Sequence, residues 1–195
     1  MIDINKIKSG DCLLRVKDNI ITACFVLFPN MEYNVCVRHA FECTHRRIRV
    51  LNNLQQAPSD IEEYCIISFL EFHSLAFIAN SAIHKSFDLV NKDPTDYKPL
   101  FESMVFQRYQ LINGDYFIVP CNPKNKSWLR IFYVSGTELS WTDQPPQDWQ
   151  TKWATISYIQ PSAYISLKIH ADTYISLFQS KAQKIMRNMK NGEGR

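Results

Sequence analysis

The chain is organised around the stretch Asn34-Val-Cys-Val-Arg-His-Ala-Phe-Glu-Cys-Thr44. Its valines, Phe41 and Cys43 alternate with residues that are mostly more polar, which is the period of a β-strand with one buried face. By the same period His39 lies on the apolar face. The stretch therefore predicts a strand that carries a histidine towards a core.

The segments around this strand are short and apolar. Lys8-Ser-Gly-Asp11 is a turn signal, and strands are expected after it at residues 12–16, 48–51 and 64–67. Ile20–Phe28 is apolar on all sides, so it fits either a buried helix or a second strand. We favour the helix, with Asp18 or Asn19 as its cap.

Two helices are expected in the middle of the chain. Ser68-Phe-Leu-Glu71 has the pattern of a capping box and opens the first, which reaches Val90 with apolar residues at three- and four-residue spacing. The second is expected over residues 99–109. After Asn113-Gly114 the pattern predicts a hairpin, two strands and a last helix capped by Asp172, at residues 115–134, 153–159, 164–169 and 173–190.

These elements predict an α+β fold, with a mixed or antiparallel sheet, two central helices and a C-terminal helix. A chain of 195 residues suits a single domain over residues 1–190, within which residues 1–112 and 113–190 could form sub-lobes. No internal repeat is recognisable. Residues 191–195 are expected to be disordered.

The composition excludes several classes of protein. Only five glycines occur and neither common nucleotide-binding glycine motif is present, so no cofactor is expected. No apolar stretch approaches the ~20 residues of a transmembrane helix, and the N-terminus lacks the apolar core of a secretory signal. The expected location is the cytoplasm, or outside the cell after export without a classical signal peptide.

The placement of the cysteines and the net charge argue against several kinds of ligand and partner. The six cysteines lie mostly in apolar surroundings without Cys-x-x-Cys spacing, which indicates reduced, buried thiols and no metal site. A net charge of +3 is too small to imply a nucleic-acid partner. The basic residues from Lys181 onward indicate a solvated helix face or, as an alternative, a surface for nucleic acid or lipid.

Three motifs carry a family likeness. Lys8-Ser-Gly-Asp-Cys-Leu-Leu14, Arg38-His39-Ala40 and Arg47-Ile-Arg-Val50 resemble motifs of circularly permuted papain-like proteins, the permuted NlpC/P60 group that includes the LRAT-like enzymes. The resemblance covers roughly the first 110 residues. It implies a catalytic histidine on a core strand, here His39, and a cysteine at the start of a later helix that together cleave or transfer an acyl group.

The expected cysteine is missing from the sequence. Its place near residues 101–106 holds Glu102 and Ser103, and Arg38 stands where the family has a serine before the histidine. A Ser103–His39 pair with Glu42 or His45 as the orienting group could act in its stead, although a serine needs a well-placed base and an oxyanion hole. The other interpretation of His39 is a core histidine with satisfied ring nitrogens.

Tryptophans mark a second candidate site. Trp141, Trp149 and Trp153 surround the loop Gln144-Pro-Pro-Gln147, with Trp128 shortly before it. Such residues often anchor partner proteins because each buries a large area at low entropic cost. The alternative is a β-rich core lined with tryptophan.

The sequence therefore predicts a non-catalytic protein-interaction module: a bacterial-type adaptor, chaperone-like subunit or effector on a degenerate papain-like scaffold, with a protein partner bound near Trp141, Trp149 and Trp153. The alternative is a hydrolase or acyltransferase that uses His39 with an unconventional serine or cysteine nucleophile. The missing helix-opening cysteine favours the interaction module.

Overall fold

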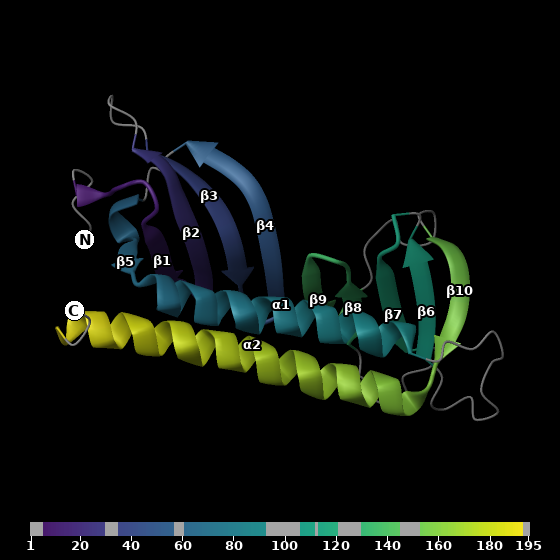
Figure 1. Ribbon diagram of the computed structural model, residues 1–195. Coiled ribbons are helices and arrows are strands. Elements are labelled where there is room, and N and C mark those ends of the chain that lie inside the picture. Colours follow the sequence, from purple (N-terminus) through teal and green to yellow (C-terminus); the bar gives the residue numbers. More distant parts are fainter. Residues whose placement is uncertain are drawn as a thin grey trace. The chain divides into compact units, whose positions relative to one another are not determined.

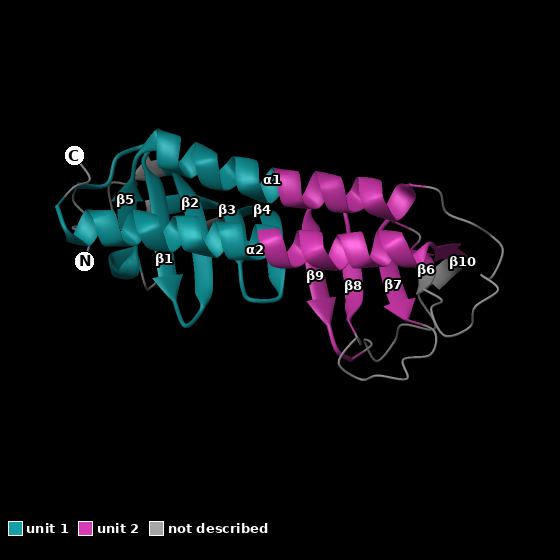
Figure 2. Cartoon of the chain, turned by 90° about the horizontal axis from the view of Figure 1, so that it is seen from below, with its two compact units in different colours: residues 1–80, 174–195 teal, residues 81–173 magenta. Residues whose placement is uncertain are grey.

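The computed structural model describes residues 6–29, 35–56, 61–92, 106–111, 113–120, 130–144 and 153–192. The chain forms two compact units (Figure 2): unit 1 contains Met1–Asn80 and Tyr174–Arg195, and unit 2 contains Ser81–Thr173. These limits differ from the sub-lobes 1–112 and 113–190 expected from the sequence, because each of the two long helices begins in one unit and ends in the other.

Five antiparallel strands make up the sheet of unit 1. Their order is β5-β1-β2-β3-β4. A two-residue turn joins the first two strands, with positive φ at Asp18 (49°) and Asn19 (63°), which is the backbone of a tight β-hairpin. The five strands are β1 (Cys12–Lys17), β2 (Ile20–Pro29), β3 (Val35–Cys43), β4 (Arg47–Gln56) and β5 (Cys65–Ile67).

The helix expected over Ile20–Phe28 is therefore wrong. Asp18 and Asn19 form the turn of a hairpin and do not cap a helix. The segment is mostly apolar because both faces of β2 are buried. Ala23 on one face and Cys24 on the other are both fully buried.

Strand β3 contains a bulge at Ala40. The pairing of β2 with β3 changes register between Ala23 and Cys24, and the pairing of β3 with β4 changes register between His39 and Phe41. Phe41 consequently faces the helices, where its ring packs against Phe72 at a centroid distance of 5.7 Å. His39 faces the other side of the sheet, so the strict alternation predicted along this strand is interrupted at its centre.

Helix α1 (Phe69–Asn91) begins as expected from the capping box. The Glu71 amide donates to Ser68 Oγ over 3.2 Å, and the Ser68 amide donates to Glu71 Oε2 over 2.8 Å. In unit 1 this helix and the end of α2 (Pro161–Lys190) lie along one side of the strands (Figure 1).

Helix α2 begins at Pro161, before the expected start at Thr173. The strand expected over residues 164–169 is thus wrong, and proline at the first helical position suits a helix start. Ile165 and Ile169 are exposed, whereas the buried residues recur with the helical period. The buried residues are Tyr164, Leu167, Ala171, Ile175, Phe178, Ala182 and Ile185.

Unit 2 repeats the connectivity of unit 1. Its strands pair antiparallel in the order β10-β6-β7-β8-β9, so in both units the fifth strand returns beside the first and a long helix follows. The sequence showed no repeat, so the duplication is visible only in the topology. The strands are β6 (Phe106–Leu111), β7 (Tyr116–Pro120), β8 (Ile131–Val134), β9 (Glu138–Thr142) and β10 (Trp153–Ile159).

The α+β class with an antiparallel sheet and a C-terminal helix is confirmed. The hairpin expected over residues 115–134 is present as the pairing of β7 with β8. The second central helix is wrong in its described part, since residues 106–109 belong to β6, and residues 99–105 lie outside the described residues. In β6 the buried Arg108 guanidinium donates to Ser157 Oγ of β10 over 2.8 Å, a contact between residues 49 positions apart.

Candidate functional site

His39 lies beside a cysteine that the sequence did not single out. Its Nδ1 is 3.4 Å from Cys24 Sγ, because the bulge at Ala40 turns the imidazole towards the neighbouring strand β2. Imidazole and thiol are the two groups of a cysteine-type nucleophilic site. The structure therefore brings together the histidine of the family likeness and an unexpected thiol.

The Cys24 thiol is deeply buried and protonated. Its side chain is 0% exposed, and burial raises its pKa to about 12, although a hydrogen bond with Tyr64 and the charge of Arg15 act in the opposite direction. A pKa of about 12 leaves on the order of one thiol in 100,000 ionised at pH 7. The pair has the geometry of a nucleophile and its base, without the thiolate that such a site needs.

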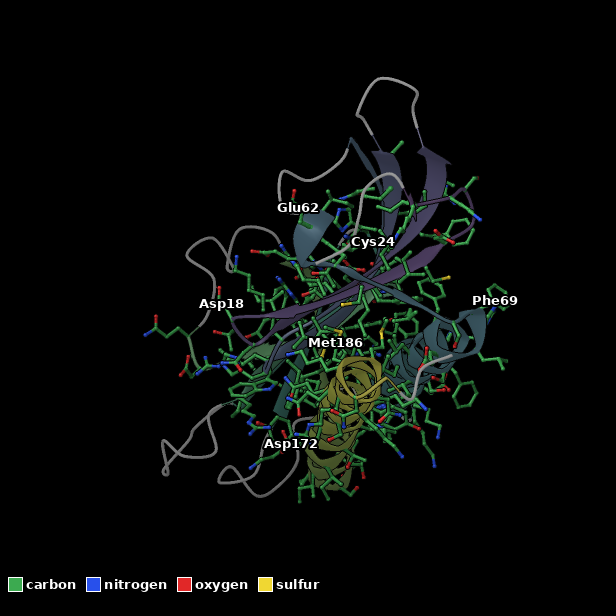
Figure 3. The ribbon with its side chains drawn as sticks, turned by 90° about the vertical axis from the view of Figure 1, so that its left-hand side faces the viewer. Asp18, Cys24, Glu62, Phe69, Asp172 and Met186 are labelled. Atoms are coloured by element: carbon green, nitrogen blue, oxygen red, sulfur yellow. The ribbon has the colours of Figure 1, made fainter. Side chains whose placement is uncertain are left out.

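A cluster of buried apolar residues surrounds Cys24 and His39 on the face of the unit 1 sheet that does not contact the helices. The 3-10 helix η2 (Ile61–Glu63) lies over this face, and Figure 3 shows Glu62 on one side of Cys24 and Met186 of α2 on the other. Tyr64, which is 1% exposed, closes the cluster. Its other buried members are Ile7, Leu13, Val26, Val37 and Ile61.

The other predicted catalytic residues are placed differently. The Glu42 carboxylate pairs with the guanidinium of Arg47 and, over 3.1 Å, with that of Arg49. His45 is exposed in the turn after β3. Ser103 lies outside the described residues, so the Ser103–His39 pair stays a prediction.

Of the predicted binding tryptophans, Trp141 is the one whose side chain is described. The ring is half-buried, with the Arg130 guanidinium 4.0 Å from its centroid, and Arg130 pairs with Asp172 on α2. Within unit 2 Arg130 thus connects the Trp141 ring to α2. Trp149 and the side chain of Trp153 lie outside the described residues.

A pocket of about 280 Å³ lies on strands β7 to β9 of unit 2. The sequence did not indicate this pocket, although it placed Phe117 and Tyr133 in one expected hairpin. The connection between β7 and β8 is long, and only short turns fix the register of a hairpin. The sequence therefore does not say which side chains of the two strands face each other. The lining residues are Phe117, Ile131, Tyr133, Glu138, Ser140, Trp141 and Thr142.

The first turns of α1 expose large apolar side chains. Phe69, Leu70 and Phe77 are 62%, 80% and 74% exposed, and Figure 3 shows Phe69 pointing away from the rest of unit 1. His73 lies between them and contacts the Phe69 ring edge-on at 4.1 Å between centroids. Phe69, Leu70 and Phe77 lie within nine positions of one helix, and we call the exposed apolar surface that they form with His73 the α1 surface.

Comparisons of the chain with protein-family models, with curated proteins and with solved structures found no match. None of the described helices is long and apolar enough to span a bilayer. Among the described residues, no group of three or more His, Cys, Asp or Glu side chains is placed to hold a metal ion. Cys12, Cys24, Cys36, Cys43 and Cys65 are free thiols.

Proposed function

We propose that the chain is a non-catalytic protein-interaction module, an adaptor, chaperone-like subunit or effector, which docks the α1 surface into an apolar groove of a partner protein. The observation that carries this proposal is the exposure of Phe69, Leu70 and Phe77. Leu70 and Phe77 lie seven positions apart, so they share one face of the helix, as do the anchors of helices that enter an apolar groove. Full burial of each large apolar side chain is favourable by roughly 1.5–3 kcal/mol, and part of this offsets the entropic cost of association.

Protonated Cys24 favours this function over catalysis, because the thiol next to His39 is neither ionised nor accessible. Five of the six cysteines lie in the described part of the chain as free thiols, and three of these are buried, which suits a reducing compartment such as the cytoplasm. The papain-like scaffold stays a prediction. Where this likeness led us to expect a buried helix, the structure has strand β2. The position expected for the catalytic cysteine lies outside the described residues.

Site-specific photo-crosslinking tests the α1 surface. A photoreactive residue is placed at position 70 or 77, and the matched control is position 177, because Leu177 is also an exposed apolar residue on a helix of unit 1. We expect one partner adduct from positions 70 and 77, none from 177, and loss of the adduct in Phe69→Glu. Equal adducts from all three positions, or an adduct untouched by Phe69→Glu, contradict the proposal.

A second candidate function is acyl transfer or hydrolysis through Cys24 and His39, which their 3.4 Å separation favours. It requires an opening of the apolar cluster that admits substrate and lowers the pKa of the thiol. Reaction with a thiol-directed acyl probe distinguishes the two functions, with half-buried Cys36 as the internal reference. Labelling of Cys24 faster than Cys36 and abolished by His39→Ala supports the enzyme, and labelling of Cys36 first supports the interaction module.

A further inference from the structure

The pocket of unit 2 has aromatic walls. Phe117 and Tyr133 lie directly opposite each other on β7 and β8, with ring centroids 5.1 Å apart, and Ser140 lies opposite Tyr133 on β9. These residues occupy the side of the sheet away from the helices, because the alternating Tyr116 and Phe132 contact Phe87 of α1 and Tyr164 of α2. Two tilted rings present π-faces and edges to whatever occupies the pocket.

Negative charge surrounds these rings. Glu138 lines the pocket, and the Tyr133 hydroxyl donates a hydrogen bond to Asp115 Oδ2, which also accepts from Asn113 Nδ2 over 2.7 Å. Burial raises the pKa of Tyr133, and the carboxylates of Asp115 and Glu138 raise it further. Tyr133 therefore stays a neutral phenol, and its hydrogen bond to a carboxylate increases the electron density of the ring.

Among the described residues of β7 to β9 and their flanking turns, the positive charge is already paired. Residues 113–120 and 130–144 contain three acids and one base, Arg130. The Arg130 guanidinium stacks on Trp141, which also lines the pocket, and its charge is paired with Asp172 of α2. An anion would meet two carboxylates and no unpaired base among these residues, whereas a cation would meet rings and carboxylates together.

We propose that this pocket binds a positively charged organic group, an ammonium or a guanidinium. A volume of about 280 Å³ is at the small end for ligand sites, which suits one cationic head group with its aliphatic stem. The cation lies over the rings of Tyr133 and Phe117 and pairs with Glu138. The proposal is independent of the α1 surface, since it concerns other residues in the other unit.

The test is a ¹H–¹⁵N NMR titration of the full chain. The ligands are N-acetylarginine amide, N-acetyllysine amide and tetramethylammonium, and the control is N-acetylcitrulline amide, which has the shape of the arginine compound without its charge. We expect saturable shifts of the Phe117, Tyr133 and Ser140 amides with the cations, and at least about tenfold weaker binding of the citrulline compound. Equal affinity for arginine and citrulline amides overturns the proposal.

The same titration separates two sources of the cation. Tighter binding of the arginine or lysine amide than of tetramethylammonium identifies the side chain of a protein partner as the occupant. Equal or tighter binding of tetramethylammonium identifies a free organic cation. Shifts that saturate with acetate and not with any cation contradict the proposal.

Variants assign the binding to named groups. Glu138→Gln is expected to weaken binding about fivefold, and Asp88→Asn, which removes the same charge from an exposed site on α1 in unit 2, is expected to leave it unchanged. Tyr133→Leu removes a ring and is expected to weaken binding at least as much. Phe117→Leu provides a second ring deletion if the first variant does not fold. Indistinguishable affinities of Glu138→Gln and Asp88→Asn overturn the proposal.

Discussion

The two units share one strand order and use the helix-free face of their sheets in opposite ways. In unit 1 this face is a second core, in which Leu13, Cys24 and Val37 pack beneath Tyr64. In unit 2 the same face carries a pocket lined by Tyr133 and other residues of β7 to β9. The difference teaches that the topology specifies where a face lies, while side-chain size and the covering segments decide whether it is core or site.

The helix-free faces of the two units also differ in how their charged residues are arranged. In unit 1 Arg15, Thr22, Glu42 and Arg49 stand directly opposite one another across four strands, and Glu42 pairs with Arg49. Glu63 extends the pattern by pairing with Arg15. In unit 2 acids gather around aromatic rings. A face whose charges pair with one another suits structure, and a face on which acids outnumber bases suits a ligand of opposite charge.

The largest expected difference between the two faces is in tyrosine packing. Tyr64→Ala in unit 1 removes a side chain that is 1% exposed, and the cavity left behind is expected to lower the free energy of unfolding by about 3–5 kcal/mol. Tyr133→Ala in unit 2 removes a half-buried ring at an expected cost of about 1–2 kcal/mol. Urea unfolding measures both. Equal losses break the distinction between a core face and a pocket face.

A smaller difference is expected between the two faces of unit 2 itself. Ser157→Ala removes the hydroxyl that accepts from the buried Arg108 guanidinium, which should cost about 1–3 kcal/mol. Ser140→Ala on the pocket side should change stability by less than about 0.5 kcal/mol. The two variants carry the same chemical change, so chemical unfolding compares them directly. A cost at Ser140 as large as that at Ser157 contradicts the division of faces.

The smallest effect concerns pH. His170 in unit 2 lies 2.9 Å through Nε2 from the Ala82 carbonyl oxygen, and burial lowers its pKa. As the pH falls, the imidazole of His170 therefore becomes protonated in the unfolded chain first, at a pKa of about 6.5. The contribution of His170 to stability is complete above that pH and is lost as the pH falls through the lower pKa of the folded state.

Glu63 in unit 1 also has a lowered pKa, caused first by its hydrogen bond with Lys17, so its contribution is lost in a more acid window, below the ordinary glutamate pKa. Thermal melts between pH 7 and pH 4 should show a decline that His170→Gln removes and Glu63→Gln leaves in place. A decline below pH 6.5 that persists in His170→Gln rules out this assignment.

Signals that act between near neighbours were readable in the sequence. The capping box joins Ser68 and Glu71, three positions apart, and it placed the start of α1 correctly. Asp18 and Asn19 were also recognised as a signal, but the same residue types cap helices and make hairpin turns, and only the pairing of β1 with β2 chose between them. Ile165, Leu167 and Ile169 fitted the strand period over too short a window to exclude a helix.

By itself the sequence determined the α+β class, the long helix that begins after Ser68 and the strand that carries His39, because these depend on periodicity and on hydrogen bonds between residues a few positions apart. Only the tertiary structure decided what each face of the sheets contains. Cys24 meets His39 across 15 positions through a bulge, and Tyr133 meets Asp115 across 18. Such contacts depend on strand register, and a shift of one residue would turn every side chain of a strand to the opposite face.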